Sequence, residues 1–171
     1  MIAGNVPELP ITNHQIPSPD HAFEKEHRLQ LFVEGVAHKL PFDLDRLTAA
    51  LTRFLRENGV RKRVHVILVG DRYIADLNRR YRDVDGPTDV LAFDLGVSEH
   101  ADDVEGEVYV SLDRAREQAE ELEIPMAEEG VRLIVHGLLH LAGHDHEKGG
   151  KAEAQMKRET ETGVEQVMKW M

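Results

Sequence analysis

The sequence contains no cysteine among its 171 residues. The absence of thiols excludes disulfide bonds and thiolate-bound metals, so any metal ion must bind through nitrogen and oxygen atoms. No stretch approaches the roughly 18 consecutive apolar residues that a membrane-spanning helix needs. The first residues, MIAGNVPELPITNHQ, lack the basic start and the apolar core of a secretory signal. We therefore expect a cytoplasmic protein with no membrane partner.

Aromatic residues are also scarce, at 5% of the chain, which disfavours extensive stacking on nucleic-acid bases. The formal net charge of −11 counts against nucleic-acid binding by the protein as a whole, although a local basic groove can still bind phosphates. Hydrophobic residues at 41% and charged residues at 31% are typical of a globular protein, and the length indicates one domain.

The proline-rich start, residues 1–27, predicts an extended or disordered N-terminal arm, and residues 28–171 predict one folded domain. Alternating and β-branched segments predict four strands. The first begins near Leu29, and the other three cover Val64–Val69, Asp89–Leu95 and Glu107–Ser111. Amphipathic segments predict five helices: one capped by Asp43 and ended by Gly59, one over 71–81, one capped by Ser111 with Leu112, Ala115, Ala119 and Leu122 facing inward, one from Met126 to about Ala142, and one from about Lys151.

The third and fourth strands are expected to pair antiparallel across the acidic loop SEHADDVEGE. The helix between the second and third strands suggests that those two strands run parallel. The predicted fold is α+β, a small mixed four-stranded sheet packed with about five helices.

One short segment, HGLLHLAGHDH, gathers histidines on an apolar helix. His136 and His140 are four residues apart, so they share one helix face. Buried imidazoles need partners, because an unpaired buried polar group costs about 1–3 kcal/mol. Gly143 is placed to end the helix, after which the chain can return His146 toward the other two histidines. Three imidazoles with an open fourth position are typical of a catalytic zinc site, so we predict one Zn²⁺ per chain at the C-terminal end of this helix.

The alternative to a zinc site is that the three histidines are core residues with hydrogen-bond partners. Their spacing on an apolar helix disfavours this alternative. Asp145 is a candidate to orient a ligand histidine, and His144 is expected to face solvent. The spacing also matches the metzincin protease pattern H-E-x-x-H-x-x-G-x-x-H. Gly137 occupies the position of the glutamate that serves those enzymes as the base, so a metalloprotease is the weaker interpretation.

Three segments resemble the YbeY family of metal-dependent endoribonucleases, over roughly Leu29 to His146. The family's histidine signature, H-G-x-L-H-L-x-G-Y-D-H, is matched by His136, Gly137, Leu139, His140, Leu141, Gly143, Asp145 and His146. A second signature, L-N-x-x-Y-R followed by P-T-D-V-L-S-F, is matched by Leu77, Asn78, Tyr81, Arg82, Pro87, Thr88, Asp89, Val90, Leu91 and Phe93. A third, G-D-I, appears as Gly106, Glu107 and Val108. The chain departs from these signatures at Ala92, Asp94 and His144.

This resemblance implies a metal-dependent hydrolase domain over 28–171 that cleaves single-stranded RNA with zinc on three histidines. It implies a role in ribosomal RNA maturation at the 3′ end of 16S rRNA, with the small ribosomal subunit as a partner and no DNA substrate. It also implies that Arg82 is needed for activity. The departures at Ala92 and His144 bear on substrate preference more than on metal binding.

The residues themselves favour Arg82 as a phosphate contact, because it lies in a polar turn before a predicted strand. The base stays open between Asp89, Asp145 and a metal-bound hydroxide. A third class of function is a ribosome assembly factor without catalysis, in which the metal only braces the fold.

Overall fold

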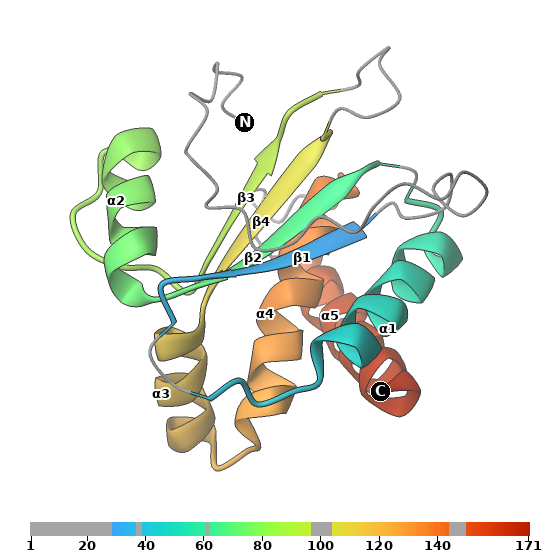
Figure 1. Ribbon diagram of the computed structural model, residues 1–171. Coiled ribbons are helices and arrows are strands. Elements are labelled where there is room, and N and C mark those ends of the chain that lie inside the picture. The colour runs from blue at the N-terminus through green and yellow to red at the C-terminus, as the bar shows by residue number, and fades with distance from the viewer. Residues whose placement is uncertain (1–28, 37–38, 61, 97–103, 144–149) are drawn as a thin grey trace, which may run out of the picture.

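The structure is a computed structural model, and it describes residues 29–36, 39–60, 62–96, 104–143 and 150–171 (Figure 1). In chain order these residues form β1 (Leu29–Glu34), α1 (Leu44–Glu57), β2 (Val64–Val69), α2 (Asp71–Arg82), β3 (Val90–Asp94), β4 (Gly106–Ser111), α3 (Leu112–Leu122), α4 (Met126–Leu141) and α5 (Lys151–Trp170). The predicted α+β class with a mixed four-stranded sheet is confirmed. The arm predicted over residues 1–27 lies outside the described residues.

The strands lie in the order β1-β2-β4-β3. β1, β2 and β4 run parallel, and β3 runs antiparallel to β4. The predicted antiparallel pairing of the third and fourth strands is therefore confirmed, whereas the predicted parallel pairing of the second and third strands is wrong. The segment after α2 leads back to the end of the sheet where β2 finishes, and β3 starts there and runs in the opposite direction (Figure 1). β4 lies beside β2 because its side chains are buried on both faces, as the centre of a sheet requires.

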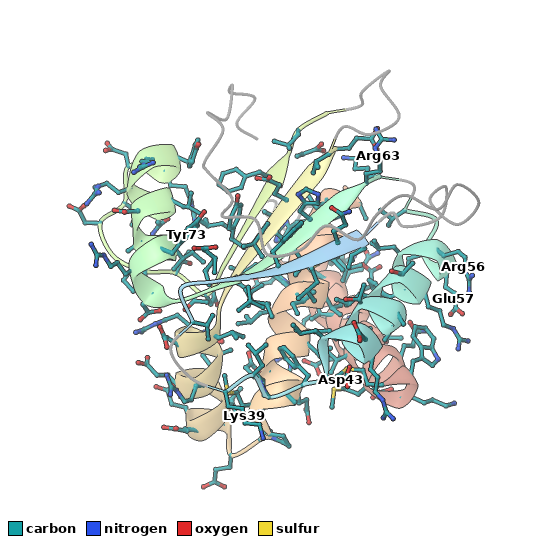
Figure 2. All side chains as sticks on the ribbon, viewed as in Figure 1. Lys39, Asp43, Arg56, Glu57, Arg63 and Tyr73 are labelled. Carbon is teal, nitrogen blue, oxygen red and sulfur yellow. The ribbon has the colours of Figure 1, made fainter. Side chains whose placement is uncertain are left out.

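The helices cover the two faces of the sheet unequally (Figure 1). One face packs against α1, α3, α4 and α5 and forms the larger core cluster, which includes Leu51, Val66, Val108 and Leu138. The other face packs against α2 and forms a smaller cluster with several aromatic rings. Tyr73 projects from α2 toward the sheet, where its ring stacks on that of Tyr109 with the ring centroids 6.1 Å apart (Figure 2).

α4 lies in the middle of the larger core. Its apolar residues are buried on nearly all sides, as predicted: Val131, Leu133, Ile134, Val135, Leu138, Leu139 and Leu141. The helix ends at Leu141, and Gly143 follows in the left-handed conformation with φ +87°, which confirms the predicted stop. None of the helices in the described ranges is long and apolar enough to cross a membrane.

The predicted helix caps are confirmed, and one predicted core residue is not. Asp43, which precedes α1 (Figure 2), accepts a hydrogen bond from the Arg46 N–H at 3.0 Å, and Ser111 caps α3 in the same way. Leu122 was expected to face inward, but it is 58% exposed. It is the last residue of α3, where the chain turns at Glu123 toward α4 and leaves the sheet.

Candidate metal centre

The last two turns of α4 bring two imidazoles together. His136 and His140 lie on one face of the helix, and their Nε2 atoms are 3.2 Å apart. The two rings are nearly perpendicular, with an interplanar angle of 86°, and both residues are partly buried. The predicted spacing therefore produces the predicted convergence for these two residues.

The separation of the two nitrogens fits a shared metal ion. Two imidazole nitrogens bound at about 2.0–2.1 Å to a tetrahedral zinc ion lie about 3.3 Å apart, close to the 3.2 Å between His136 and His140. Within the described ranges, no group of three or more histidine, cysteine, aspartate or glutamate side chains is placed to hold a metal. The third predicted ligand, His146, lies outside those ranges, as do His144 and Asp145.

An ionic network holds α4 and α5 together one turn before the histidines. The Arg132 side chain is 20% exposed and pairs with Glu128 and Glu129 on α4 and with Glu161 on α5. The hydrogen bond with Glu161, together with that with Glu129, holds the pKa of Arg132 above its usual value against the opposing effect of burial. The side chain of Glu129 is only 3% exposed, so its charge depends on Arg132 for compensation.

Gly137 faces the sheet. A Cβ atom placed on Gly137 would lie 2.4 Å from Cγ1 of Val108 in β4 and 3.2 Å from Cγ2 of Val90 in β3. The position that carries the glutamate base in metzincins is therefore a point of close approach between α4 and the sheet. A glutamate has no room there unless the helix moves, which weakens the metalloprotease interpretation further.

Arg82, the predicted phosphate contact, is the last residue of α2 and is exposed. Asp83 follows it in the left-handed conformation with φ 55° and ends the helix. Arg79 on the same helix pairs with Asp76 at 2.6 Å. Within the described ranges no ion pair joins Arg82 to Asp83 or Asp85, which is the contact that a purely structural role would predict.

Arg82 and the two histidines belong to helices that pack on opposite faces of the sheet. Side chains alternate along β3, so Ala92 packs into the larger cluster with α4, whereas Phe93 packs into the smaller cluster with α2. Tyr81, the neighbour of Arg82, meets Phe93 edge-on with the ring centroids 5.1 Å apart. The helix that ends in Arg82 and the helix that carries the imidazoles therefore pack on opposite faces of β3.

Asp89, one of the candidate bases, is held by its neighbours at the start of β3. One of its carboxylate oxygens accepts hydrogen bonds from the Val90 N–H at 2.8 Å and from the Thr88 hydroxyl at 3.3 Å. The other accepts from the Gln118 side chain at 3.2 Å. These hydrogen bonds connect the start of β3 to α3, so Asp89 has a structural role in this turn.

A second hydrogen-bond network, which the sequence does not suggest, fixes the N-terminal end of α2. Asp71 is the first residue of α2, and its carboxylate accepts hydrogen bonds from Ser111 at 2.7 Å and from Arg114. Burial alone would raise the pKa of Asp71, but these two hydrogen bonds outweigh burial and lower the pKa below its usual value. The network joins the start of α2 to the start of α3 and so orients the helix that ends in Arg82.

The α2 face of the sheet carries a partly buried carboxyl group. Glu107 in β4 lies opposite His65 in β2, and it accepts a hydrogen bond from the Tyr109 hydroxyl at 3.0 Å. Burial raises the pKa of Glu107, and the hydrogen bond from Tyr109 only partly offsets this effect. Burial also lowers the pKa of His65. In both groups burial shifts the pKa in the direction that penalises the charged form.

Two of the three consecutive basic residues before β2, Lys62 and Arg63, have paired charges. Lys62 pairs with Asp94, and Arg63 pairs with Glu105 at 3.4 Å, at the end of the sheet where β2 and β4 begin (Figure 2). Arg61 lies outside the described residues.

Comparison with known proteins connects this architecture to one family. Residues 33–168 match the family model described as Endoribonuclease YbeY. Endoribonuclease YbeY of Carboxydothermus hydrogenoformans is 43% identical over 121 residues, which cover 71% of this chain and 82% of that protein. Its counterpart in Thermotoga maritima is 35% identical over 139 residues, which cover 81% of this chain and 88% of that protein.

The fold agrees with a solved structure of similar sequence. The solution structure of a Thermotoga maritima protein is 34% identical to this chain and superimposes with a TM-score of 0.58, covering 81% of this chain and 88% of that one. The family match contains α4, the end of α2 and β3, and so it includes both imidazoles and Arg82. By sequence and by fold, the chain belongs to the YbeY family of endoribonucleases.

Proposed function

We propose that the protein is a zinc-dependent endoribonuclease that cleaves single-stranded RNA in the cytoplasm. We further propose that it acts in ribosomal RNA maturation at the 3′ end of 16S rRNA, with the small ribosomal subunit as its partner. The distance of 3.2 Å between the Nε2 atoms of His136 and His140, which fits two ligands of one tetrahedral zinc ion, is the observation that carries the proposal. The names of the similar proteins support the class of reaction.

His136, His140 and His146 are the proposed ligands of one zinc ion per chain. Imidazole binds a metal in its neutral form, so zinc affinity should fall as the pH drops below about 6.5, the ordinary pKa of histidine. Elemental analysis of the single alanine variants tests the ligand set. Full zinc retention by His140→Ala would contradict it.

The remaining chemistry divides between the metal and the residues of the chain. A bound zinc ion would polarise a phosphoryl oxygen or lower the pKa of a water molecule to about 7. Arg82 would bind the scissile phosphate through its planar fork of N–H donors, which matches two phosphate oxygens at once. Because α2 and α4 pack on opposite faces of β3, an RNA backbone that contacts both Arg82 and the imidazoles would have to cross the sheet at this strand.

The phosphate contact is tested with Arg82→Ala and Arg82→Lys. A hydrogen bond to a charged group contributes about 1.5–3 kcal/mol, so Arg82→Ala should weaken RNA affinity about 10- to 150-fold. Turnover should fall by a further factor of about 10²–10³ if the contact tightens in the transition state. Arg82→Lys keeps the charge but loses the fork, so it should recover little of the rate.

Arg79→Ala is the matched control for these variants, because Arg79 lies on the same helix but is already paired with Asp76. Single-turnover cleavage, zinc content and melting temperature should be measured together on each protein. A near-normal cleavage rate for Arg82→Ala would contradict the phosphate contact. Activity lost only together with zinc or stability would show that Arg82 serves the fold.

One incubation separates the three classes of function. Protein of verified zinc content is mixed with single-stranded RNA, duplex RNA, single-stranded DNA or casein, each with and without chelator. We expect chelator-sensitive cleavage of the single-stranded RNA alone. Casein cleavage would indicate a protease, and zinc-dependent folding without any turnover would indicate an assembly factor. Co-sedimentation with purified small ribosomal subunits tests the partner.

A further inference from the structure

A buried hydroxyl on α5 faces the first proposed ligand. Thr160 is 4% exposed, and its Oγ1 lies 3.5 Å from Nδ1 of His136. Threonines within helices commonly donate to the carbonyl four residues earlier, and three in the described helices do so. Those hydroxyls, of Thr48, Thr52 and Thr162, donate to backbone carbonyls at 2.7, 2.8 and 2.9 Å. The Thr160 hydroxyl instead reaches across to a ring nitrogen on the neighbouring helix.

We propose that Thr160 is a positioning residue that fixes the tautomer of His136. In this arrangement Nδ1–H of His136 donates to Oγ1 of Thr160, and the lone pair of the ring is left on Nε2, the nitrogen that faces His140. Histidines that bind metals usually donate their second ring N–H to a neighbouring acceptor, which orients the ring and raises its basicity. The inference rests on the zinc site proposed above, because it assigns Thr160 a role toward that ion.

The same contact makes the two imidazoles inequivalent before any metal binds. The Nε2 atoms of His136 and His140 are 3.2 Å apart, so only one of them can carry a hydrogen between the rings. If Thr160 holds the hydrogen of His136 on Nδ1, then Nε2 of His140 is the donor. His136 is then the preformed ligand, and His140 must give up or move its Nε2 hydrogen when the ion binds.

Three variants test the assignment. Thr160→Val keeps the shape of the side chain and removes the hydroxyl, and Thr160→Ser restores a hydroxyl. Thr162→Val is the matched control, since Thr162 is exposed on the same helix and its hydroxyl donates within that helix. Zinc affinity is measured by competition with a colorimetric chelator. Thr160→Val should bind zinc about 10- to 100-fold more weakly, whereas the Ser variant and the Thr162→Val control should stay close to the unaltered protein.

A second measurement needs no metal. Long-range ¹H–¹⁵N spectra of the zinc-free protein, recorded well above the ordinary histidine pKa of about 6.5, should show His136 with its hydrogen on Nδ1 and His140 with its hydrogen on Nε2. Thr160→Val should lose this preference at His136, and Thr160→Ser should keep it. Melting temperatures in chelator identify any general loss of stability, which a purely structural role would produce without a change of tautomer.

The outcomes separate this inference from the proposed zinc site. Equal zinc affinity of Thr160→Val and the unaltered protein would overturn the role of Thr160 while leaving the site intact. The same holds if zinc-free His136 carries its hydrogen on Nε2. If the unaltered protein binds no zinc, the proposed site fails, and the spectra still decide whether Thr160 sets the tautomer.

Discussion

Replacing Gly137 with alanine should destabilise the protein, although alanine is the better helix former. In a helix interior alanine is favoured over glycine by about 1 kcal/mol. The added Cβ, however, would lie 2.4 Å from Cγ1 of Val108, which is completely buried in β4. Val108 cannot move aside easily, because β4 is hydrogen-bonded to a strand on each side. Overpacking of a core costs about 1–3 kcal/mol, and this close contact calls for the upper half of that range.

We therefore expect Gly137→Ala to lower the free energy of unfolding by about 1–2 kcal/mol after the gain in helix propensity is subtracted. Equilibrium urea unfolding followed by circular dichroism measures the change. Gly130→Ala, also in α4, is the matched control. A Cβ on Gly130 would lie 2.9 Å from the ring edge of Phe42, which is only partly buried and has room to shift. This control should be close to neutral.

Val108→Ala supplies the second half of the test, because it removes the atoms that the added Cβ would meet. Residues in contact show coupling energies of about 0.5–3 kcal/mol, so the Gly137→Ala/Val108→Ala double variant should be less destabilised than the sum of the single variants. If Gly137→Ala is as stable as Gly130→Ala, or if the two substitutions are additive, Gly137 does not set the approach of α4 to the sheet.

Two further predictions concern charged groups. Arg132→Met leaves the buried carboxylate of Glu129 without its partner, and breaking a buried ion pair in this way costs about 3–5 kcal/mol. Because the Arg132 side chain is 20% exposed, the free energy of unfolding should fall by no more than the lower limit, about 3 kcal/mol. Urea unfolding measures the loss, which adding Glu129→Gln should partly reverse; no loss in Arg132→Met would contradict the argument. Burial raises the pKa of Glu107 in the folded protein, so ionisation of Glu107 opposes folding as the pH rises through that value. Glu107→Gln should therefore be more stable than the unaltered protein at pH near 8. The difference should shrink as the pH falls through the raised pKa of Glu107 and vanish well below about 4.3, the ordinary glutamate pKa; lower stability at pH 8 would refute this sign.

The local elements could be predicted from the sequence because local patterns determine them. The bounds of β2 are those predicted, and α4 ends where Gly143 indicated. The convergence of His136 and His140 also follows from helix geometry alone, since both lie on one element. In each case the information lies within a few residues of the feature.

Features that join distant segments could not be predicted in the same way. The place of β4 between β2 and β3 depends on which strand best fills a centre buried on both faces. The contact of Thr160 with His136 joins residues 24 apart in sequence, and a threonine in a polar segment gives no sign that its hydroxyl will be buried. Which face of α4 meets the sheet, and so whether Gly137 lies against Val108, depends on the packing of the whole helix.

The position of β3 at the edge of the sheet has a consequence for local unfolding. Among the described residues β3 is hydrogen-bonded to a strand on one side only, so its amides should exchange with solvent before those of β4, which is paired on both sides. Opening of β3 would release Phe93 from Tyr81 and Val90 from Gly137 in one event. The helix that ends in Arg82 and the helix that carries the imidazoles would then loosen together, so amide exchange in β3 reports on the order of both sides of the site at once.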